Sequence, residues 1–125
     1  MIKIEKPEKT QRTVIQQRTR KAIMDKSARL FRDKGYGSTS LRDIASATGM
    51  KAGSLYYHFS SKEELAEEVL TQGLFHVAER VKEAVEALPS EASPLEKIRA
   101  AMVGHLTALL EKGDYTSANI RCYNH

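Results

Sequence analysis

Several residue types and patterns are scarce in this sequence, and two of these absences exclude a class of protein. The single cysteine, Cys122, cannot form a disulfide within the chain, so nothing indicates an oxidising compartment. Tryptophan is absent and proline occurs three times in 125 residues. No apolar run approaches the roughly 20 residues of a membrane-spanning helix, and the charged N-terminal stretch lacks the apolar core of a secretion signal. We therefore expect a cytoplasmic protein without a membrane partner.

What the sequence does contain is a globular composition with an uneven charge. Apolar residues make up 41% of the chain and charged residues 29%, which is enough apolar material for a folded core. Up to Lys62 there are 14 Lys and Arg against 5 Asp and Glu, a net charge of +9, whereas the remainder has 6 against 11, a net charge of −5. The first half therefore predicts a surface for a polyanion. Composition alone leaves nucleic acid, a membrane surface and an acidic protein as alternatives.

The first part of the chain predicts an arm followed by a long helix. Pro7 and the dense charge around it favour a flexible basic arm over residues 1–11, either solvated or reaching along DNA phosphates or into the minor groove. Apolar and small residues then recur at intervals of three and four, which predicts a helix that ends near Lys34. Its inward stripe is Ile15, Ala22, Ile23, Ser27, Leu30 and Phe31.

Two short helices are expected next. Ser40, with Asp43 three positions later, has the spacing of a capping box and predicts the start of the second helix, which Gly49 ends. A third helix is expected over about residues 52–58, with Leu55 and Phe59 inward. No run of alternating β-branched residues competes with this pattern, so the predicted fold class is all-α.

The second half predicts two longer helices. The serines and glutamates of Ser60–Glu64 contain two overlapping capping boxes, and a stripe from Leu65 to Leu88 predicts about seven helical turns after them. Ser93-Pro94-Leu95-Glu96 combines an N-cap with a proline at the first helical position, which predicts a fifth helix ending at Gly113. We expect its inward residues to be Leu95, Ile98, Met102, Leu106 and Leu109. Residues 114–125 are compatible with the start of another helix.

The stretch SLRDIASATGMKAGSLYYHF, residues 40–59, carries the functional signal. Ala45 lets two short helices cross closely, and Gly49 supplies the backbone freedom that a tight turn between them requires. This is the arrangement of a helix-turn-helix, whose second helix enters the DNA major groove. A plain helical hairpin in a bundle remains an alternative on spacing alone.

The polar face of the third helix favours DNA over the plain hairpin. With Leu55 and Phe59 inward, the residues left near the surface are Lys51, Ser54, Tyr56, Tyr57 and His58. An exposed tyrosine can pack on a sugar or a thymine methyl while its hydroxyl donates to a phosphate. Lys62 in the first turn of the next helix opposes the helix dipole, a placement that is favourable if its ammonium and the backbone amides share a phosphate.

At these residues the sequence resembles the DNA-binding domain of the TetR family. The resemblance covers about residues 17–77; it includes AIMDKSARLFRDKGYGSTSLRDIA, and its most specific part is GSLYYHFSSKEEL, Gly53 to Leu65. It implies a three-helix DNA-binding domain over residues 12–77, with the helix-turn-helix at 40–59, and a helical regulatory domain that begins over 78–125. The implied DNA contacts come from the start of the second helix, the third helix and the start of the fourth: Thr39, Ser40, Arg42, Lys51, Ala52, Gly53, Ser54, Tyr56, Tyr57, His58 and Lys62.

The resemblance also implies partners. A family member of this kind is a homodimer that binds palindromic operator DNA and leaves it when a small-molecule effector occupies the C-terminal domain. Family members usually carry more helices than this sequence does, so either the sequence is incomplete or the protein is unusually short. Residues 119–125 show no finishing cap, so we expect the regulatory domain to be incomplete. Apolar residues that would suit a hydrophobic effector, or equally a core, are Leu70, Leu74, Met102 and Leu106.

Other chemistries have little support. The four histidines and one cysteine show no metal-ligand spacing, and no activated nucleophile motif is present, so we predict no catalytic residue, no metal and no cofactor. The alternatives to a ligand-released repressor are a DNA-binding protein that responds to no ligand and a small helical interaction module.

Overall fold

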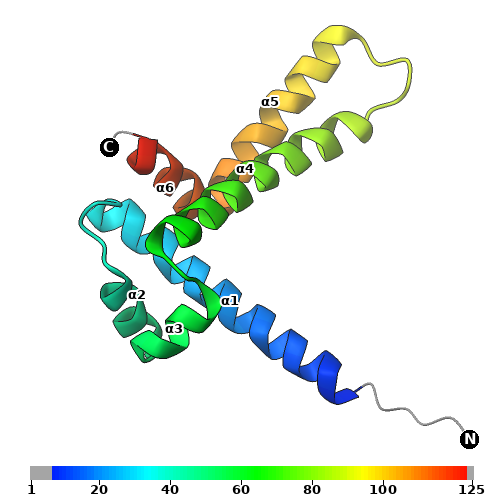
Figure 1. Cartoon of the computed structure of the whole chain (residues 1–125). Helices are drawn as coiled ribbons and strands as arrows, with labels where there is room; N and C mark the ends of the chain where they lie inside the picture. Colours follow the sequence, from blue (N-terminus) through cyan, green and yellow to red (C-terminus); the bar gives the residue numbers. More distant parts are fainter. Residues whose placement is uncertain (1–6, 124–125) are drawn as a thin grey trace, which may run out of the picture.

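The computed structural model of the protein describes residues 7–123, and the side chains of residues 11–118. Six helices make up this part of the chain and no strand occurs in it, so the prediction of an all-α fold is confirmed (Figure 1). The helices are α1 Pro7–Lys34, α2 Leu41–Thr48, α3 Ala52–His58, α4 Lys62–Glu86, α5 Pro94–Glu111 and α6 Gly113–Tyr123.

A single apolar core holds α1, α2, α3 and the first turns of α4 together. Its largest side chains are withdrawn completely from solvent, and such burial contributes about 1.5–3 kcal/mol per large side chain. The fully buried large apolar residues are Ile23, Phe31, Ile44, Leu55, Phe59, Leu65 and Val69. We call this unit, from α1 to the start of α4, the head.

The first helix begins earlier than the sequence indicates. Because α1 starts at Pro7, the prediction of a flexible arm is wrong for residues 7–11, whereas residues 1–6 lie outside the described part of the chain. Proline suits the first helical position because its fixed φ is helical and its missing N–H needs no partner there. Ile15 and Ala22, which we expected in the inward stripe, are exposed. Ile15 is exposed to 61% because the N-terminal half of α1 projects beyond the other helices (Figure 1).

The predicted helix boundaries around the second and fourth helices are confirmed. The Ser40 hydroxyl accepts a hydrogen bond from the backbone N–H of Asp43, and the Asp43 carboxylate accepts one from the backbone N–H of Ser40. Gly49 ends α2 at a φ of 69°, in the left-handed region that glycine adopts without strain. At the start of α4 the Ser61 hydroxyl accepts from the backbone N–H of Glu64. These caps fix where α2 and α4 begin and where α2 ends.

Helix α5 lies against α4, but with the face opposite to the predicted one. The capping box of Ser93 and Glu96 is present as predicted. The residues of α5 that face α4 are small: a Cβ on Gly104 would lie 2.7 Å from the carbonyl oxygen of Arg80 and 3.0 Å from the Cβ of Ala84. Helix α5 is apolar on more than one side, and its small residues allow the closest approach to α4.

The expected inward residues of α5 therefore face outward, which corrects the prediction. Leu109 is half-buried, and Leu74 of the predicted α4 stripe is also exposed, to 60%. The other four expected core residues of α5 are exposed to between 58% and 68%: Leu95, Ile98, Met102 and Leu106. Within the described residues these side chains form an open apolar face.

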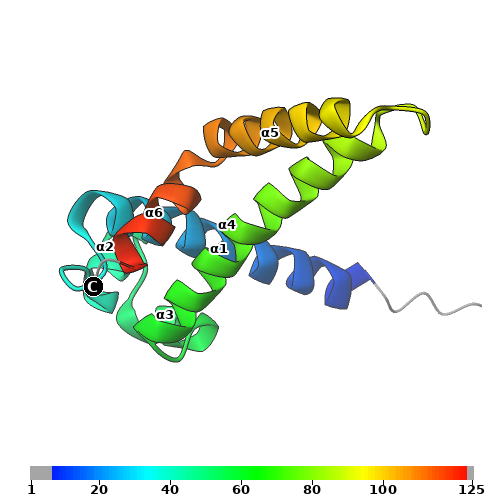
Figure 2. The same ribbon diagram turned by 90° about the horizontal axis from the view of Figure 1, so that it is seen from above.

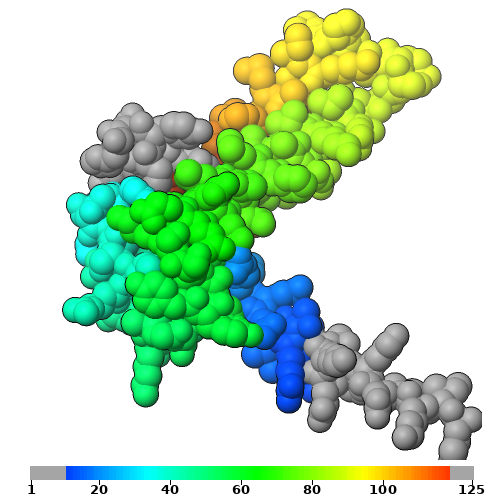
Figure 3. Space-filling view, viewed as in Figure 1, coloured from blue at the N-terminus to red at the C-terminus, as the bar shows by residue number. Residues whose placement is uncertain are grey.

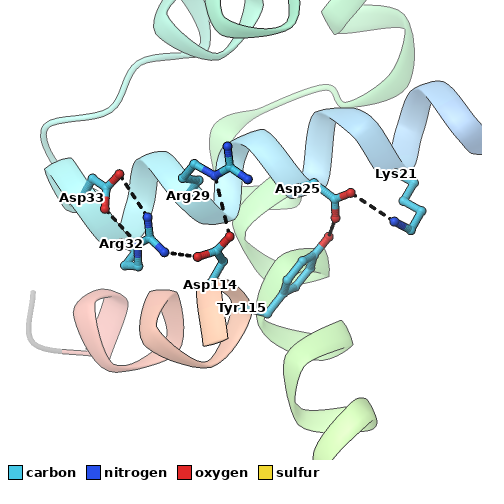
Figure 4. A network of polar contacts seen from close by, with 7 residues as sticks. All are labelled: Lys21, Asp25, Arg29, Arg32, Asp33, Asp114 and Tyr115. Carbon is cyan, nitrogen blue, oxygen red and sulfur yellow. Dashed lines mark hydrogen bonds and ion pairs between the residues drawn. The ribbon is translucent and has the colours of Figure 1, made fainter. Parts of the chain in front are cut away.

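Helix α6 turns back and packs on α1 and α4, so that the C-terminal part of the chain touches the head (Figure 2). The Tyr115 hydroxyl donates a hydrogen bond of 2.5 Å to the Asp25 carboxylate on α1. Asp114 forms ion pairs with Arg29, at 3.7 Å, and with Arg32 (Figure 4). Burial, together with the Asp25 carboxylate, raises the pKa of Tyr115 well above its ordinary value, so the phenol stays protonated as the donor.

Candidate nucleic-acid interface

Helix α3 presents a polar and aromatic face to solvent. Leu55 and Phe59 are fully buried in the head core and fix the orientation of this seven-residue helix. Tyr56 is exposed to 54% and Tyr57 to 75%. The other exposed residues on or just before the helix are Lys51, Ala52, Gly53 and Ser54. The structure thus holds two large aromatic side chains outward on a rigid support, as the sequence predicts.

The connection between α2 and α3 has the geometry of a tight turn. The backbone N–H of Met50 donates to the carbonyl of Ala45 at 2.9 Å, and Gly49 provides the left-handed residue. Ala45 is 3% exposed, so its small side chain lies at the crossing of the two helices. Ile44 is buried on the same face, and Leu41 packs beside it. This arrangement is that of a helix-turn-helix.

A hollow of about 460 Å³ lies where the starts of α2 and α4 meet α3. It brings together five residues that the sequence assigns to DNA: Thr39, Ser40, Arg42, Tyr56 and Lys62. The Lys62 ammonium donates to the Tyr36 carbonyl at 3.0 Å and lies 4.2 Å from the centre of the Tyr36 ring. An ammonium has three N–H groups, so this contact leaves donors for a phosphate oxygen at the hollow.

Thr39 differs from its neighbours in the set of predicted DNA contacts. Its side chain is 1% exposed, and its hydroxyl donates to the Gly35 carbonyl at 2.8 Å. Gly35 has a φ of 86° and ends α1, so Thr39 closes the loop between α1 and α2. We therefore leave the Thr39 side chain out of the candidate interface.

The C-terminal end of α3 is held by α1, a relation that sequence reasoning missed. Arg20 Nη1 donates to the His58 carbonyl at 2.6 Å, and the same guanidinium forms an ion pair with Glu68 of α4. Its central carbon lies 4.1 Å from the centre of the Phe59 ring. The half-buried His58 ring meets the Tyr57 ring edge-on, with 5.3 Å between centroids. Arg20 thus joins three helices at one end of the exposed α3 face.

Charge at the start of α2 is set by the capping box. The backbone N–H of Ser40, with further contacts from Lys34 and the Ser40 hydroxyl, lowers the pKa of Asp43 below its ordinary value. Asp43 is therefore ionised at neutral pH and pairs with Lys34 at 3.2 Å. Arg42 beside it is exposed and forms no ion pair with the described side chains. The cationic groups of the hollow are Arg42 and Lys62.

The residues predicted for an effector are only partly brought together. An apolar hollow of about 370 Å³ between α4 and α5 is lined by Val81, Ala101, Met102, His105 and Leu106. Met102 and Leu106 were predicted, whereas Leu70 is half-buried elsewhere on α4 and Leu74 is exposed. Periodicity placed all four on inward stripes and could not indicate which side of α4 and which side of α5 face each other.

Metal binding and membrane insertion each require a recognisable arrangement in the described part of the chain. No group of three or more His, Cys, Asp or Glu side chains there has the arrangement of a metal site. None of the described helices combines the length and the apolar character needed to cross a membrane.

Comparison with known families and curated proteins places the head among bacterial regulators. The family described as "Bacterial regulatory proteins, tetR family" matches residues 23–69. The HTH-type transcriptional repressor KstR2 of Mycolicibacterium smegmatis is 37% identical over 90 residues, which are 72% of this chain and 42% of that protein. The biofilm operon icaADBC HTH-type negative transcriptional regulator IcaR of Staphylococcus aureus is 48% identical over 46 residues, 37% of this chain and 25% of that protein.

Solved structures agree with this comparison. The crystal structure of the TetR family transcriptional regulator PfmR from Thermus thermophilus has a TM-score of 0.71 and 31% identity over 79% of this chain and 51% of that one. The crystal structure of a gamma-butyrolactone receptor (ArpA-like protein) has a TM-score of 0.72 and 30% identity over 86% of this chain and 54% of that one. The chain therefore spans about half the length of the proteins it matches.

Proposed function

Because the chain belongs to the tetR family of bacterial regulatory proteins, we propose that it is a transcriptional repressor whose head binds operator DNA. In this proposal the DNA-binding domain spans residues 12–77, and the part from residue 78 begins a regulatory domain. The observation that carries the proposal is the exposed face of α3, where Tyr56 and Tyr57 stand 54% and 75% exposed on a fully buried support. Such a face fits the major groove, which admits an α-helix.

The geometry supports two kinds of DNA contact, one to the sugar-phosphate backbone and one to the base edges. Ser40, Arg42, Tyr56 and Lys62 meet at one hollow, which suits a phosphate and the adjoining sugar. Lys51, Ser54 and His58 are assigned to the groove itself, with Lys51 and Ser54 in positions to read base edges. Ala52 and Gly53 let the start of α3 approach closely, since a Cβ on Gly53 would meet nothing of the protein within 4 Å.

The proposal includes a second copy of the chain and an effector. Helix-turn-helix dimers bind two half-sites about one helical turn apart, so a homodimer on a palindromic operator is the expected complex. A small apolar effector fits the hollow between α4 and α5, which is lined mostly by Val81, Met102 and Leu106. The protein acts in the cytoplasm, where its DNA lies, and its role is regulation and not catalysis.

The test is DNA binding by the chain and by two variants that remove single phosphate contacts. A duplex is first enriched from a random-sequence pool with the wild-type chain, and its affinity is then measured over a range of salt concentrations. Tyr57→Phe and Lys62→Ala should each weaken binding, and Lys62→Ala should lower the slope of log K against log salt by about 0.9. Unchanged affinity and slope in both variants would refute this docking.

The same chain and DNA pool distinguish this function from the other candidate functions. Exchange of Ser54 or Lys51 should change which sequences are enriched, because these residues face the base edges in the proposal. A thermal-shift screen of small apolar compounds should stabilise the chain with at least one of them. A screen without any stabilisation would favour a DNA-binding protein that responds to no ligand. A chain that retards no duplex at low salt would instead be a helical interaction module.

A further inference from the structure

The N-terminal half of α1 lies beside the exposed face of α3, and apart from the alternative of a DNA-reaching arm over residues 1–11, no predicted DNA contact comes from it. Gln16 Nε2 donates a hydrogen bond of 3.2 Å to the Tyr57 hydroxyl, and the two residues are 41 positions apart in the sequence. All side chains from residue 11 to residue 18 are exposed, and this segment projects from the body of the molecule (Figures 1 and 3). A solvated helix end would not need a contact with the most exposed tyrosine of the head.

The register of α1 defines which of its residues continue the face of α3. Arg20 contacts the His58 carbonyl and Gln16 the Tyr57 hydroxyl, so the side that faces α3 is known from two contacts. Residues four positions apart share one side of a helix, and Arg12 is four positions before Gln16. It therefore lies about 6 Å further along the same side. Arg18, two positions after Gln16, points to nearly the opposite side.

The hydrogen bond from Gln16 also defines what the Tyr57 hydroxyl can do. A phenol oxygen accepts through its lone pairs and donates through one O–H. Because the amide of Gln16 occupies a lone pair, the O–H remains to donate to a phosphate oxygen, and successive hydrogen bonds strengthen one another. Tyr56 lines the hollow with Ser40 and Lys62 on the other side of α3. The two tyrosines thus stand at opposite edges of the α3 face, with Tyr57 at the edge next to α1.

We infer that the side of α1 formed by Arg12 and Gln16 extends the DNA interface beyond the helix-turn-helix. Gln16 is a positioning residue that holds the Tyr57 hydroxyl toward the DNA backbone. Arg12 contacts a phosphate beyond the one that Tyr57 reaches, since it is exposed and forms no hydrogen bond or ion pair with the described side chains of residues 11–118. This inference rests on the proposed function and adds a segment outside the matched residues 23–69.

The role of Arg12 is tested against Arg18, which has the same charge and lies on the same helix with an exposed side chain. Binding of the full chain to the enriched duplex is measured at several salt concentrations. Arg12→Ala should lower the salt slope by about 0.9, the value for one phosphate that is no longer neutralised, and Arg18→Ala should leave it unchanged. Equal slopes for the two variants, whether both lowered or both unchanged, would overturn the contact. Thermal unfolding of both variants checks that the fold is intact.

The role of Gln16 is tested against Gln17 by a double-mutant cycle. Gln16→Ala should weaken binding to the duplex. Gln17 is an exposed neighbour of the same residue type, and Gln17→Ala should leave binding unchanged. In a Tyr57→Phe background Gln16→Ala should have no further effect, because the hydroxyl that it positions is already gone. A full effect of Gln16→Ala in that background, or none in the wild-type chain, would overturn the positioning role.

A failure of the extended interface can be distinguished from a failure of the proposed DNA-binding function. If the wild-type chain binds no duplex, the proposed function is wrong. If the wild-type chain binds and Tyr57→Phe and Lys62→Ala weaken it, while Arg12→Ala and Gln16→Ala bind as the wild type does, only the extended interface is wrong.

Discussion

Gly53 offers a prediction in which protein stability and DNA binding change in opposite directions. It is the second residue of α3, and its φ lies outside the left-handed region that favours glycine. A Cβ added there would meet no protein atom within 4 Å. Gly53→Ala therefore removes backbone entropy from the unfolded chain without a clash, which should stabilise the head by about 0.5–1 kcal/mol. The melting temperature should rise by about 2–5 °C.

The methyl group that Gly53→Ala adds should weaken DNA binding. It projects from the part of α3 that we place against the groove, where the backbone has to approach closely. We expect affinity to fall about tenfold or more, equivalent to about 1.4 kcal/mol. The salt slope should not change, because no charge is removed. Melting followed by circular dichroism and binding followed by fluorescence anisotropy measure the two effects on one preparation.

The matched control is Gly113→Ala. A Cβ on Gly113 also meets nothing within 4 Å, and this residue begins α6, away from α3. It should leave DNA affinity unchanged. Two results would refute the reasoning: a Gly53→Ala chain that is less stable, because α3 would then be packed differently, or one that binds the duplex as well as the wild type does.

Three further predictions concern the fold that supports the interface. Gly104→Ala should destabilise the chain by about 1–3 kcal/mol in urea unfolding, because its Cβ would lie 2.7 Å from the Arg80 carbonyl oxygen; an unchanged midpoint would contradict the close packing of α4 and α5. Ser40→Ala should cost about 1 kcal/mol because the α2 cap is removed, and an equally stable variant would contradict the capping box. Asp43→Asn should destabilise the chain at neutral pH, and this effect should disappear as the pH falls. Because folding lowers the pKa of Asp43, its ionised carboxylate stabilises the fold fully at pH values above the ordinary pKa of 3.8, and this contribution is lost as the pH falls through the pKa of the folded state. A destabilisation that is independent of pH would contradict the role of the carboxylate.

The sequence predicted the parts of the head that depend on local signals. Ser40 with Asp43, Gly49 and Ser61 act within a few residues of their own positions, so their patterns define where α2 and α4 begin and where α2 ends. The buried faces of α2 and α3 also follow from spacing, because each short helix has one apolar side. Tyr57 was expected outward for the same reason, and it is.

The parts that the sequence did not predict depend on contacts between distant segments. Arg20 and His58 are 38 positions apart, and Asp25 and Tyr115 are 90 positions apart, so no local pattern indicates either pair. Helix α5 has apolar residues on most of its circumference, and periodicity alone favoured the large side chains over Gly104 for the contact with α4. The early start of α1 was missed because dense charge favoured a solvated arm, whereas a helix that is already nucleated extends at little cost.

The central claim is that the exposed face of α3, with the starts of α2 and α4, binds duplex DNA. Backbone amide chemical shifts of the labelled chain, recorded with and without the enriched duplex, test it most directly. We predict shift changes over residues 40–42, 51–58 and at Lys62, with none over residues 94–111 of α5. Changes confined to α5, or no change in the head at a saturating concentration of duplex, would contradict it.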